Sequence, residues 1–119
     1  MSPSTPAAKI IVIIRKRPDI SLDEFQTHYE KNHVPLILST CRGMSKYVRN
    51  YVQPGSDLHP TGHKAEYDCV TEAWFDTLED FEKFKADFAN SAAIAADEER
   101  FVDKSSLQLF QVTEAGGVV

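Results

Sequence analysis

The segment KIIVIIRKR, residues 9–17, places the strongest constraint on how this chain can fold. Residues 10–14 are all β-branched and apolar, and the run is too short to form a helix of its own. A strand without polar alternation is typical of one that is buried on both faces. We therefore expect helices to cover one face of its sheet and a second copy of the chain to cover the other.

The first helix is predicted from a capping signal followed by an apolar stripe. Ser21 can cap the helix, and Glu24, three residues on, can complete a capping box. The stripe includes Phe25 and continues at helical spacing. Pro35 lacks a backbone N–H and crowds the preceding turn. We expect the helix to break near His33 and a short second piece to begin around the proline.

Three more strands and one more long helix follow along the chain. Alternating or β-branched stretches predict strands at residues 44–52, 66–75 and 105–114. Thr77 begins a second amphipathic helix, and residues 91–101 predict a further helical turn or two. The order β-α-β-β-α-β predicts an α+β protein with the ferredoxin-like fold, in which both helices cover one face of an antiparallel sheet.

With 119 residues, 42% of them hydrophobic, the chain has the length and composition of one domain with one core. We expect a flexible N-terminal tail over residues 1–8, a domain over 9–114 and a C-terminal tail over 115–119. The formal net charge of −5, without a dense run of Lys or Arg, argues against a nucleic-acid partner.

Two further features bear on location. No apolar run approaches the length that spans a bilayer, and the first residues lack the basic and apolar regions of a secretory signal, so no membrane partner is expected. Cys41 and Cys69 lie far apart without a CxxC spacing, which favours free thiols in a reducing compartment. These features predict a cytoplasmic protein.

The segment QPGSDLHPTGHKA, residues 53–65, is rich in Pro and Gly and has no periodicity, so it is either a mobile lid or slack chain. His59 and His63 lie four residues apart. Pro60 and Gly62 forbid the helix that would bring the two rings together on a metal ion, and no metal site is expected. His63 is instead a candidate for substrate contact at the mouth of a cavity.

Three segments carry a resemblance to a known family: RKRPDISLDEFQTHYEKNHVPL at residues 15–36, YDCVTEAWFDTLEDF at residues 67–81 and DEERFVD at residues 97–103. Together with the element order, they resemble the EthD-like family of the dimeric α+β barrel superfamily. The most specific part is F-x-x-x-Y-x-x-x-H-x-P at residues 25–35. The resemblance covers nearly the whole chain.

The resemblance implies a small homodimer, paired through its sheets, that needs no metal or organic cofactor. Several fungal members of the family act in aromatic polyketide pathways of secondary metabolism, on anthrone- or anthraquinone-type precursors. For this chain it implies a cofactor-independent lyase, most directly a decarboxylase of such a carboxylic acid that works by acid–base catalysis. A polyketide dehydratase or cyclase in the same fold, a non-catalytic small-molecule-binding protein and a bare structural dimer remain open as alternatives.

His33 and Tyr29 are the main candidates for the chemistry. They lie one helical turn apart, on the side of Phe25, and His33 occupies the histidine position of the family motif. His33 can give or take a proton near pH 7, and Tyr29 can hold a developing enolate oxygen. The alternatives are a helix-end histidine that binds a carbonyl group and a core tyrosine. His28 falls off this stripe and is expected at the surface, five residues from His33 and outside any paired metal spacing.

Acidic residues are the candidates for partners of His33. Glu72 shares a strand face with apolar neighbours, so burial would raise its pKa and make it an acid or a residue that orients His33; a solvated face is the alternative. Asp97 and Glu98 lie where the family carries an acidic pair. Asp97 is a second candidate for setting the tautomer of His33, whereas Glu98 is expected to be solvated. The residues expected to contact the substrate are Phe25, Tyr47, Tyr51, His63, Trp74 and Phe88.

Overall fold

The structure is a computed structural model that describes residues 6–119; residues 1–5 of the predicted N-terminal tail lie outside this range. The strands are β1 (Ala8–Ile14), β2 (Met44–Tyr51), β3 (Cys69–Phe75) and β4 (Gln108–Val112). The helices are α1 (Leu22–His28), α2 (Val34–Thr40), α3 (Leu78–Ala89) and α4 (Ala92–Phe101), with a π-helical turn, η1 (Tyr29–His33), between α1 and α2. Among the helices of residues 6–119, none combines the length and the apolar character that crossing a bilayer requires.

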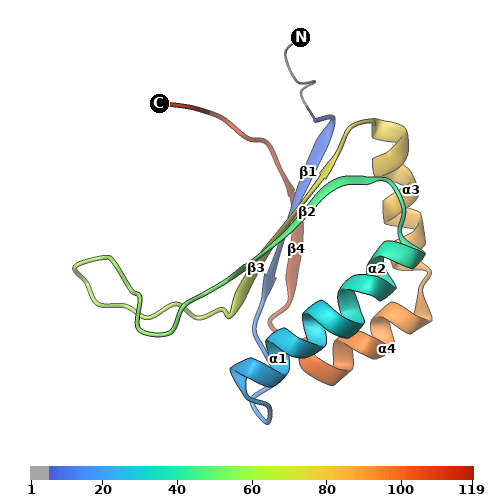
Figure 1. Ribbon diagram of the computed structural model, residues 1–119. Helices are drawn as coiled ribbons and strands as arrows, with labels where there is room; N and C mark the ends of the chain where they lie inside the picture. Colours follow the sequence, from blue (N-terminus) through green and yellow to red (C-terminus); the bar gives the residue numbers. More distant parts are fainter. Residues whose placement is uncertain (1–5) are drawn as a thin grey trace.

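The four strands form one antiparallel sheet in the order β2-β3-β1-β4. β1 lies inside the sheet, where Ile10 is opposite Ala73 of β3 and Gln111 of β4. All the helices pack on one face of this sheet, as Figure 1 shows. This arrangement confirms the predicted ferredoxin-like α+β fold.

The two faces of β1 differ in how well they are covered. Ile10 and Ile14 point toward the helices and are only 3% and 4% exposed. Ile11 and Ile13 point to the opposite face, which we call the outer face, and remain half-buried. The strand is therefore apolar on both sides, while one chain covers only one side.

The core beneath the helices has two parts. The α3 cluster consists of the buried residues Ala8, Ile10, Ile37, Cys41, Ala73, Phe75, Phe81, Phe84 and Ile94. The α1 cluster consists of the buried residues Ile14, Phe25, Tyr29, Val34, Cys69, Phe101 and Val102. Both cysteines are free thiols within these clusters. The boundary between the two clusters is where the candidate site lies.

Both predicted helix caps are confirmed. The hydroxyl of Ser21 accepts a hydrogen bond from the N–H of Glu24, and the carboxylate of Glu24 accepts one from the N–H of Ser21. The hydroxyl of Thr77 accepts the N–H of Asp80 in the same way. Local sequence therefore determines where α1 and α3 begin.

The predicted second helical piece is confirmed, because α2 begins at Val34 with Pro35 in its first turn, but the predicted break is wrong, because the chain stays helical through the π-turn. The N–H of Val34 donates to the carbonyl of Tyr29, five residues back, and Val34 keeps helical angles. Pro35 then occupies the first turn of α2, where its missing N–H is tolerated. Widening the helix by one residue relieves the crowding that a proline ring imposes on the preceding turn.

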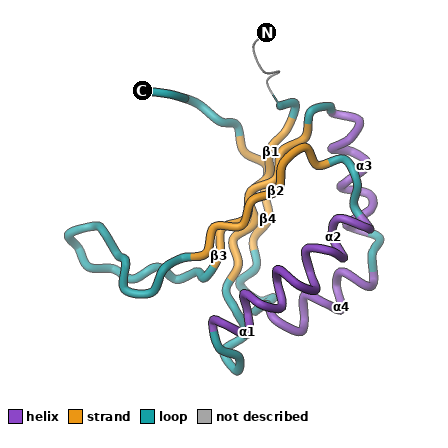
Figure 2. Tube along the Cα trace, in the orientation of Figure 1, coloured by secondary structure: helices purple, strands orange, loops and turns teal. Residues whose placement is uncertain are grey.

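Two segments project away from the body of the protein on the side opposite the helices. One is the connection between β2 and β3, of which residues 53–66 are all exposed. The other is the C-terminal segment that follows Val112 (Figures 1 and 2). Both segments extend beyond the outer face of the sheet.

Candidate functional site

A narrow apolar cavity of about 40 Å³ lies between the sheet and the helices, where the α3 and α1 clusters meet. Its walls are mainly aliphatic and aromatic side chains from every strand and from all the helical segments except α1. The polar side chains that line it are His33, Glu98, Tyr29, Tyr47 and Thr71. An apolar space with a few convergent polar groups is the usual form of a small-molecule site.

His33 is held in one orientation by Asp97 of α4. Nδ1 of His33 lies 2.8 Å from Oδ2 of Asp97, and both residues are buried. Because an ionised carboxylate only accepts, Nδ1 carries the proton and Nε2 keeps a free lone pair. Within residues 6–119, every fully buried side-chain nitrogen or oxygen has a hydrogen-bond partner. Nε2 of His33 has none there, so this atom is not fully buried and remains accessible. His33 is one of the residues that line the cavity.

The surroundings of His33 favour its neutral form. Burial lowers the pKa of His33 below its ordinary value, and the hydrogen bond to Asp97 opposes this effect only in part. A neutral imidazole with a fixed tautomer and a free Nε2 is suited to accept a proton. The structure therefore brings His33 and Asp97 together and fixes the orientation of the imidazole.

His28 binds the other oxygen of the same carboxylate instead of lying free at the surface. Nε2 of His28 lies 3.0 Å from Oδ1 of Asp97, and the His28 side chain is 20% exposed. In an ordinary α-helix, positions five apart point in different directions, which is why a surface position was expected. The π-turn between them adds one residue and brings His28 and His33 to the same side. Across residues 6–119, no three His, Cys, Asp or Glu side chains are grouped in a way that could hold a metal ion.

Phe101 packs against both histidines. Its ring centroid lies 4.8 Å from that of His28 and 4.8 Å from that of His33, and the residue is 1% exposed. Tyr29 also packs on this ring, at 5.4 Å. The aromatic ring thus limits the movement of both imidazoles while Asp97 fixes their hydrogen bonds.

Glu98 lies on the cavity wall next to Asp97, contrary to the expected solvated position. Burial raises the pKa of Glu98, although Lys104, with Nζ 3.5 Å from Oε1, opposes this effect. A signal in the sequence was available: counted from Ile94, positions 97, 98 and 101 follow the i+3, i+4, i+7 pattern of an inward helical stripe. The structure therefore adds a carboxyl group with a raised pKa to the site.

Tyr29 and Tyr47 are linked through their hydroxyl groups. The hydroxyl of Tyr47 donates to that of Tyr29 at 3.4 Å, and Tyr29 in turn lies 2.7 Å from the hydroxyl of Thr71. Burial raises the pKa of Tyr29 well above its ordinary value and that of Tyr47 to about 12. Both phenols therefore stay neutral, and either hydroxyl of the Tyr29–Thr71 pair can be the donor.

The expected role of Glu72 as a partner of His33 requires correction. Alternate residues of β3 face opposite sides of the sheet, and Glu72 and Trp74 both lie on the outer face. Nζ of Lys9 lies 2.7 Å from Oε2 of Glu72, and this bond lowers the pKa of Glu72 instead of raising it. Trp74 donates its N–H to Glu114 and does not line the cavity.

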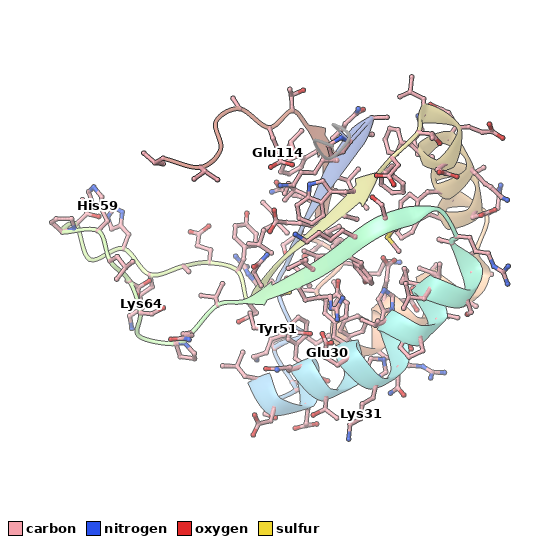
Figure 3. The ribbon with its side chains drawn as sticks, turned by 45° about the horizontal axis from the view of Figure 1, so that its top comes forward. Glu30, Lys31, Tyr51, His59, Lys64 and Glu114 are labelled. Carbon is pink, nitrogen blue, oxygen red and sulfur yellow. The ribbon has the colours of Figure 1, made fainter. Side chains whose placement is uncertain are left out.

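The other expected substrate contacts divide into two groups. Tyr47 and Phe88 line the cavity. Phe25 is instead a core residue, 1% exposed, whose ring packs on that of Tyr51 at 6.2 Å, and neither lines the cavity. His63 is exposed on the projecting β2–β3 segment, whose neighbouring residues are labelled in Figure 3.

Glu30 fastens the π-turn to the sheet and so helps to place His33. Its carboxylate accepts two hydrogen bonds from Arg49 of β2, at 2.7 and 2.9 Å, and one from the hydroxyl of Tyr51. These contacts lower the pKa of Glu30, chiefly through the bond from Arg49. Figure 3 shows Glu30 and Tyr51 facing each other between the helix and β2.

Comparison with known proteins agrees with this fold. Residues 17–105 match the family model described as the EthD domain. An EthD family protein from Bacillus halodurans is similar in structure, with 16% identity, coverage of 91% of this chain and 99% of that one, and a TM-score of 0.62. An EthD-like protein from Ralstonia eutropha has 19% identity, coverage of 87% and 88%, and a TM-score of 0.60.

A dimeric protein of unknown function with a ferredoxin-like fold from Bacteroides fragilis is also similar, with 15% identity, coverage of 88% and 93%, and a TM-score of 0.51. A comparison with curated proteins gave no match. At these identities the solved structures support the fold, and the domain match, which spans most of the chain and includes the residues around His33 and Asp97, identifies the family. This chain therefore belongs to the EthD domain family.

Proposed function

We propose that this protein is a cofactor-independent lyase that removes CO2 from an aromatic polyketide intermediate, an anthrone- or anthraquinone-type hydroxy acid. The observation that carries the proposal is the presence, at one apolar cavity, of His33 with a lowered pKa and Glu98 with a raised pKa. Surroundings that push two titratable groups in opposite directions are typical of an acid–base site. The resemblance to fungal members of the EthD family supports the choice of substrate class.

In this proposal, His33 is the base and Glu98 is the acid. Nε2 of His33 takes the proton of a ring hydroxyl that is ortho to the carboxylate, and the released electron pair moves into the ring. Glu98 then gives its proton to the ring carbon that bears the carboxylate. The C–C bond breaks, CO2 leaves, and the bonding pair restores the aromatic ring. His33 returns its proton to the phenolate oxygen, and solvent reprotonates Glu98.

Asp97 and the cavity walls support these steps in different ways. Asp97 stabilises the imidazolium that forms on His33 through the bond to Nδ1. The apolar walls remove water from the substrate carboxylate, which favours its loss as neutral CO2. The cavity of about 40 Å³ is smaller than an aromatic acid, so a substrate must displace side chains at its rim. Leu109, which is 43% exposed, and the half-buried Phe88 are the rim residues with room to move.

The test is to incubate the purified protein with a panel of anthrone and anthraquinone carboxylic acids and to follow product masses. A loss of CO2 supports the proposal, a loss of water would assign the same acid–base pair to dehydration, and unchanged masses across the panel would contradict a lyase. His33→Ala should abolish turnover without unfolding the protein. His59→Ala, on the exposed β2–β3 segment, is the matched control and should retain full activity.

We also propose that the protein is a homodimer that pairs through the outer face of its sheet. Apolar side chains there, including Ile11, Ile13 and Phe110, are left partly exposed by the single chain. The β2–β3 segment and the C-terminal segment both project past this face, where they would flank a second copy. The similar protein from Bacteroides fragilis is described as dimeric.

A further inference from the structure

His28 takes no part in the proton transfers proposed at the cavity, yet it binds the same carboxylate as His33. Asp97 uses Oδ1 for Nε2 of His28, at 3.0 Å, and Oδ2 for Nδ1 of His33, at 2.8 Å. Asp97 is itself 7% exposed, so the two imidazoles replace most of the water that would otherwise solvate it.

The hydrogen bonds around His28 define which of its nitrogens carries the proton. Nδ2 of Asn32 lies 3.1 Å from Nδ1 of His28, and an amide nitrogen can only donate. Nδ1 of His28 is therefore the acceptor, and its Nε2–H donates to Asp97. The carboxylate receives one N–H bond on each oxygen, and Asn32 keeps His28 in the tautomer that makes this possible.

We infer that His28 is a positioning residue that holds the second oxygen of Asp97 and thereby limits how strongly Asp97 supports a proton on His33. A carboxylate that already accepts one hydrogen bond has less charge to offer a second partner. In wild type, His28 therefore adds to the effect of burial, which is the main cause of the lowered pKa of His33. The inference rests on the proposed role of His33 as the base.

The other groups near His33 do not supply this effect. The neighbouring titratable groups are Asp97 and Glu98 of α4, His28 and Tyr29 of its own helix, and Tyr47 of β2. Both tyrosines stay neutral in the accessible pH range, because burial raises their pKa. Of these groups, only His28 shares the Asp97 carboxylate through a bond to its second oxygen. His28 is also the more exposed of the two histidines.

The experiment is a pH titration of the histidine side chains by nitrogen–proton correlation spectra, without substrate. His28→Ala should shift the titration midpoint of His33 upward, because the Asp97 carboxylate then accepts a hydrogen bond from His33 alone and stabilises the imidazolium more strongly. His28→Gln, whose amide can donate to Asp97 but cannot titrate, should keep the midpoint close to that of wild type. His59 and His63, both exposed on the β2–β3 segment, serve as internal references.

A second pair of proteins tests whether the effect passes through the carboxylate. In the Asp97→Asn background, adding His28→Ala should leave the His33 midpoint unchanged. An unshifted midpoint in His28→Ala alone, or an equal shift in both backgrounds, would overturn the inference. Because no turnover is measured, this result is independent of whether the decarboxylation assay succeeds.

Discussion

Nδ1 of His33 lies 2.8 Å from Oδ2 of Asp97, although 64 residues separate them in the chain. The bond joins η1 to α4, the two helical segments that carry the polar side of the cavity. Phe101, one turn beyond Asp97, packs on the same imidazole at 4.8 Å. One set of contacts thus both packs two helices together and orients the proposed base.

Acidification should destabilise the protein through His33. Burial lowers the pKa of His33 below the ordinary value of 6.5, so the unfolded chain takes up this proton more readily than the folded chain. The free energy of unfolding should therefore decrease as the pH falls through that ordinary value toward the lowered folded-state pKa. Urea titrations at about pH 7.5 and about pH 5.5 measure the decrease. His33→Gln should reduce it, and an equal decrease in both proteins would contradict the prediction.

Glu98 should destabilise the protein at high pH, whereas His33 does so at low pH. Burial raises the pKa of Glu98 above its ordinary value of 4.5, so the ionised form costs stability once the pH rises past that value. Glu98→Gln should therefore raise the free energy of unfolding at neutral pH, and the gain should vanish near pH 4, where wild type is also protonated. Denaturant titrations at the two pH values measure the gain. A less stable variant at neutral pH would show that the ion pair with Lys104 outweighs burial.

Phe101 should be among the most sensitive core positions. It is 1% exposed and packs on Phe25, at 5.7 Å, as well as on the two histidines. Phe101→Ala should lower the free energy of unfolding by about 3–5 kcal/mol, as measured by urea titration, because it leaves a cavity beneath α1. Leu78→Ala, at a helix position that is 62% exposed, is the control and should change it by less than about 0.5 kcal/mol.

The fold could be predicted because its signals are local. The capping box at Ser21 and the cap at Thr77 mark helix starts, and the β-branched run at residues 10–14 marks the central strand. Helical spacing also predicts that Tyr29 and His33 lie on the inward side of the helix, and both are buried. These features depend on residues a few positions apart, so periodicity detects them.

The rest of the site depends on departures from regular geometry and on long-range pairing. The π-turn at η1 shifts the helical register, so the spacing rule that relates Tyr29 to His33 fails for His28. Which face of the sheet Glu72 occupies depends on the pairing of β3 with β1. Thr71 lies on the face covered by the helices, so its neighbour Glu72 lies on the outer face. The bond between His33 and Asp97 joins distant segments, and no local pattern encodes their distance.

The single tryptophan of the chain allows the proposed dimer to be followed directly. Trp74 lies on the outer face, with Nζ of Lys9 4.4 Å from its ring centroid. Phe110→Asp, at a position 41% exposed on that face, should weaken the dimer by about tenfold or more in sedimentation experiments, and it should shift the Trp74 emission to longer wavelength. Leu38→Asp, 51% exposed on α2, is the matched control. Identical sedimentation of both variants and wild type would contradict pairing through this face.

Shortening a side chain at the rim of the cavity should improve the binding of aromatic acids. Leu109 is 43% exposed and lines the cavity, so removing its side chain lowers the cost of opening a space of only about 40 Å³ without exposing the buried core. Leu109→Ala should bind a naphthoate probe about threefold or more tightly than wild type, with little loss of stability, as measured by calorimetry and thermal unfolding. Leu58→Ala, 95% exposed on the β2–β3 segment, should bind as wild type does. Unchanged or weaker binding by Leu109→Ala would show that a ligand enters by displacing other walls, such as Phe88 of α3.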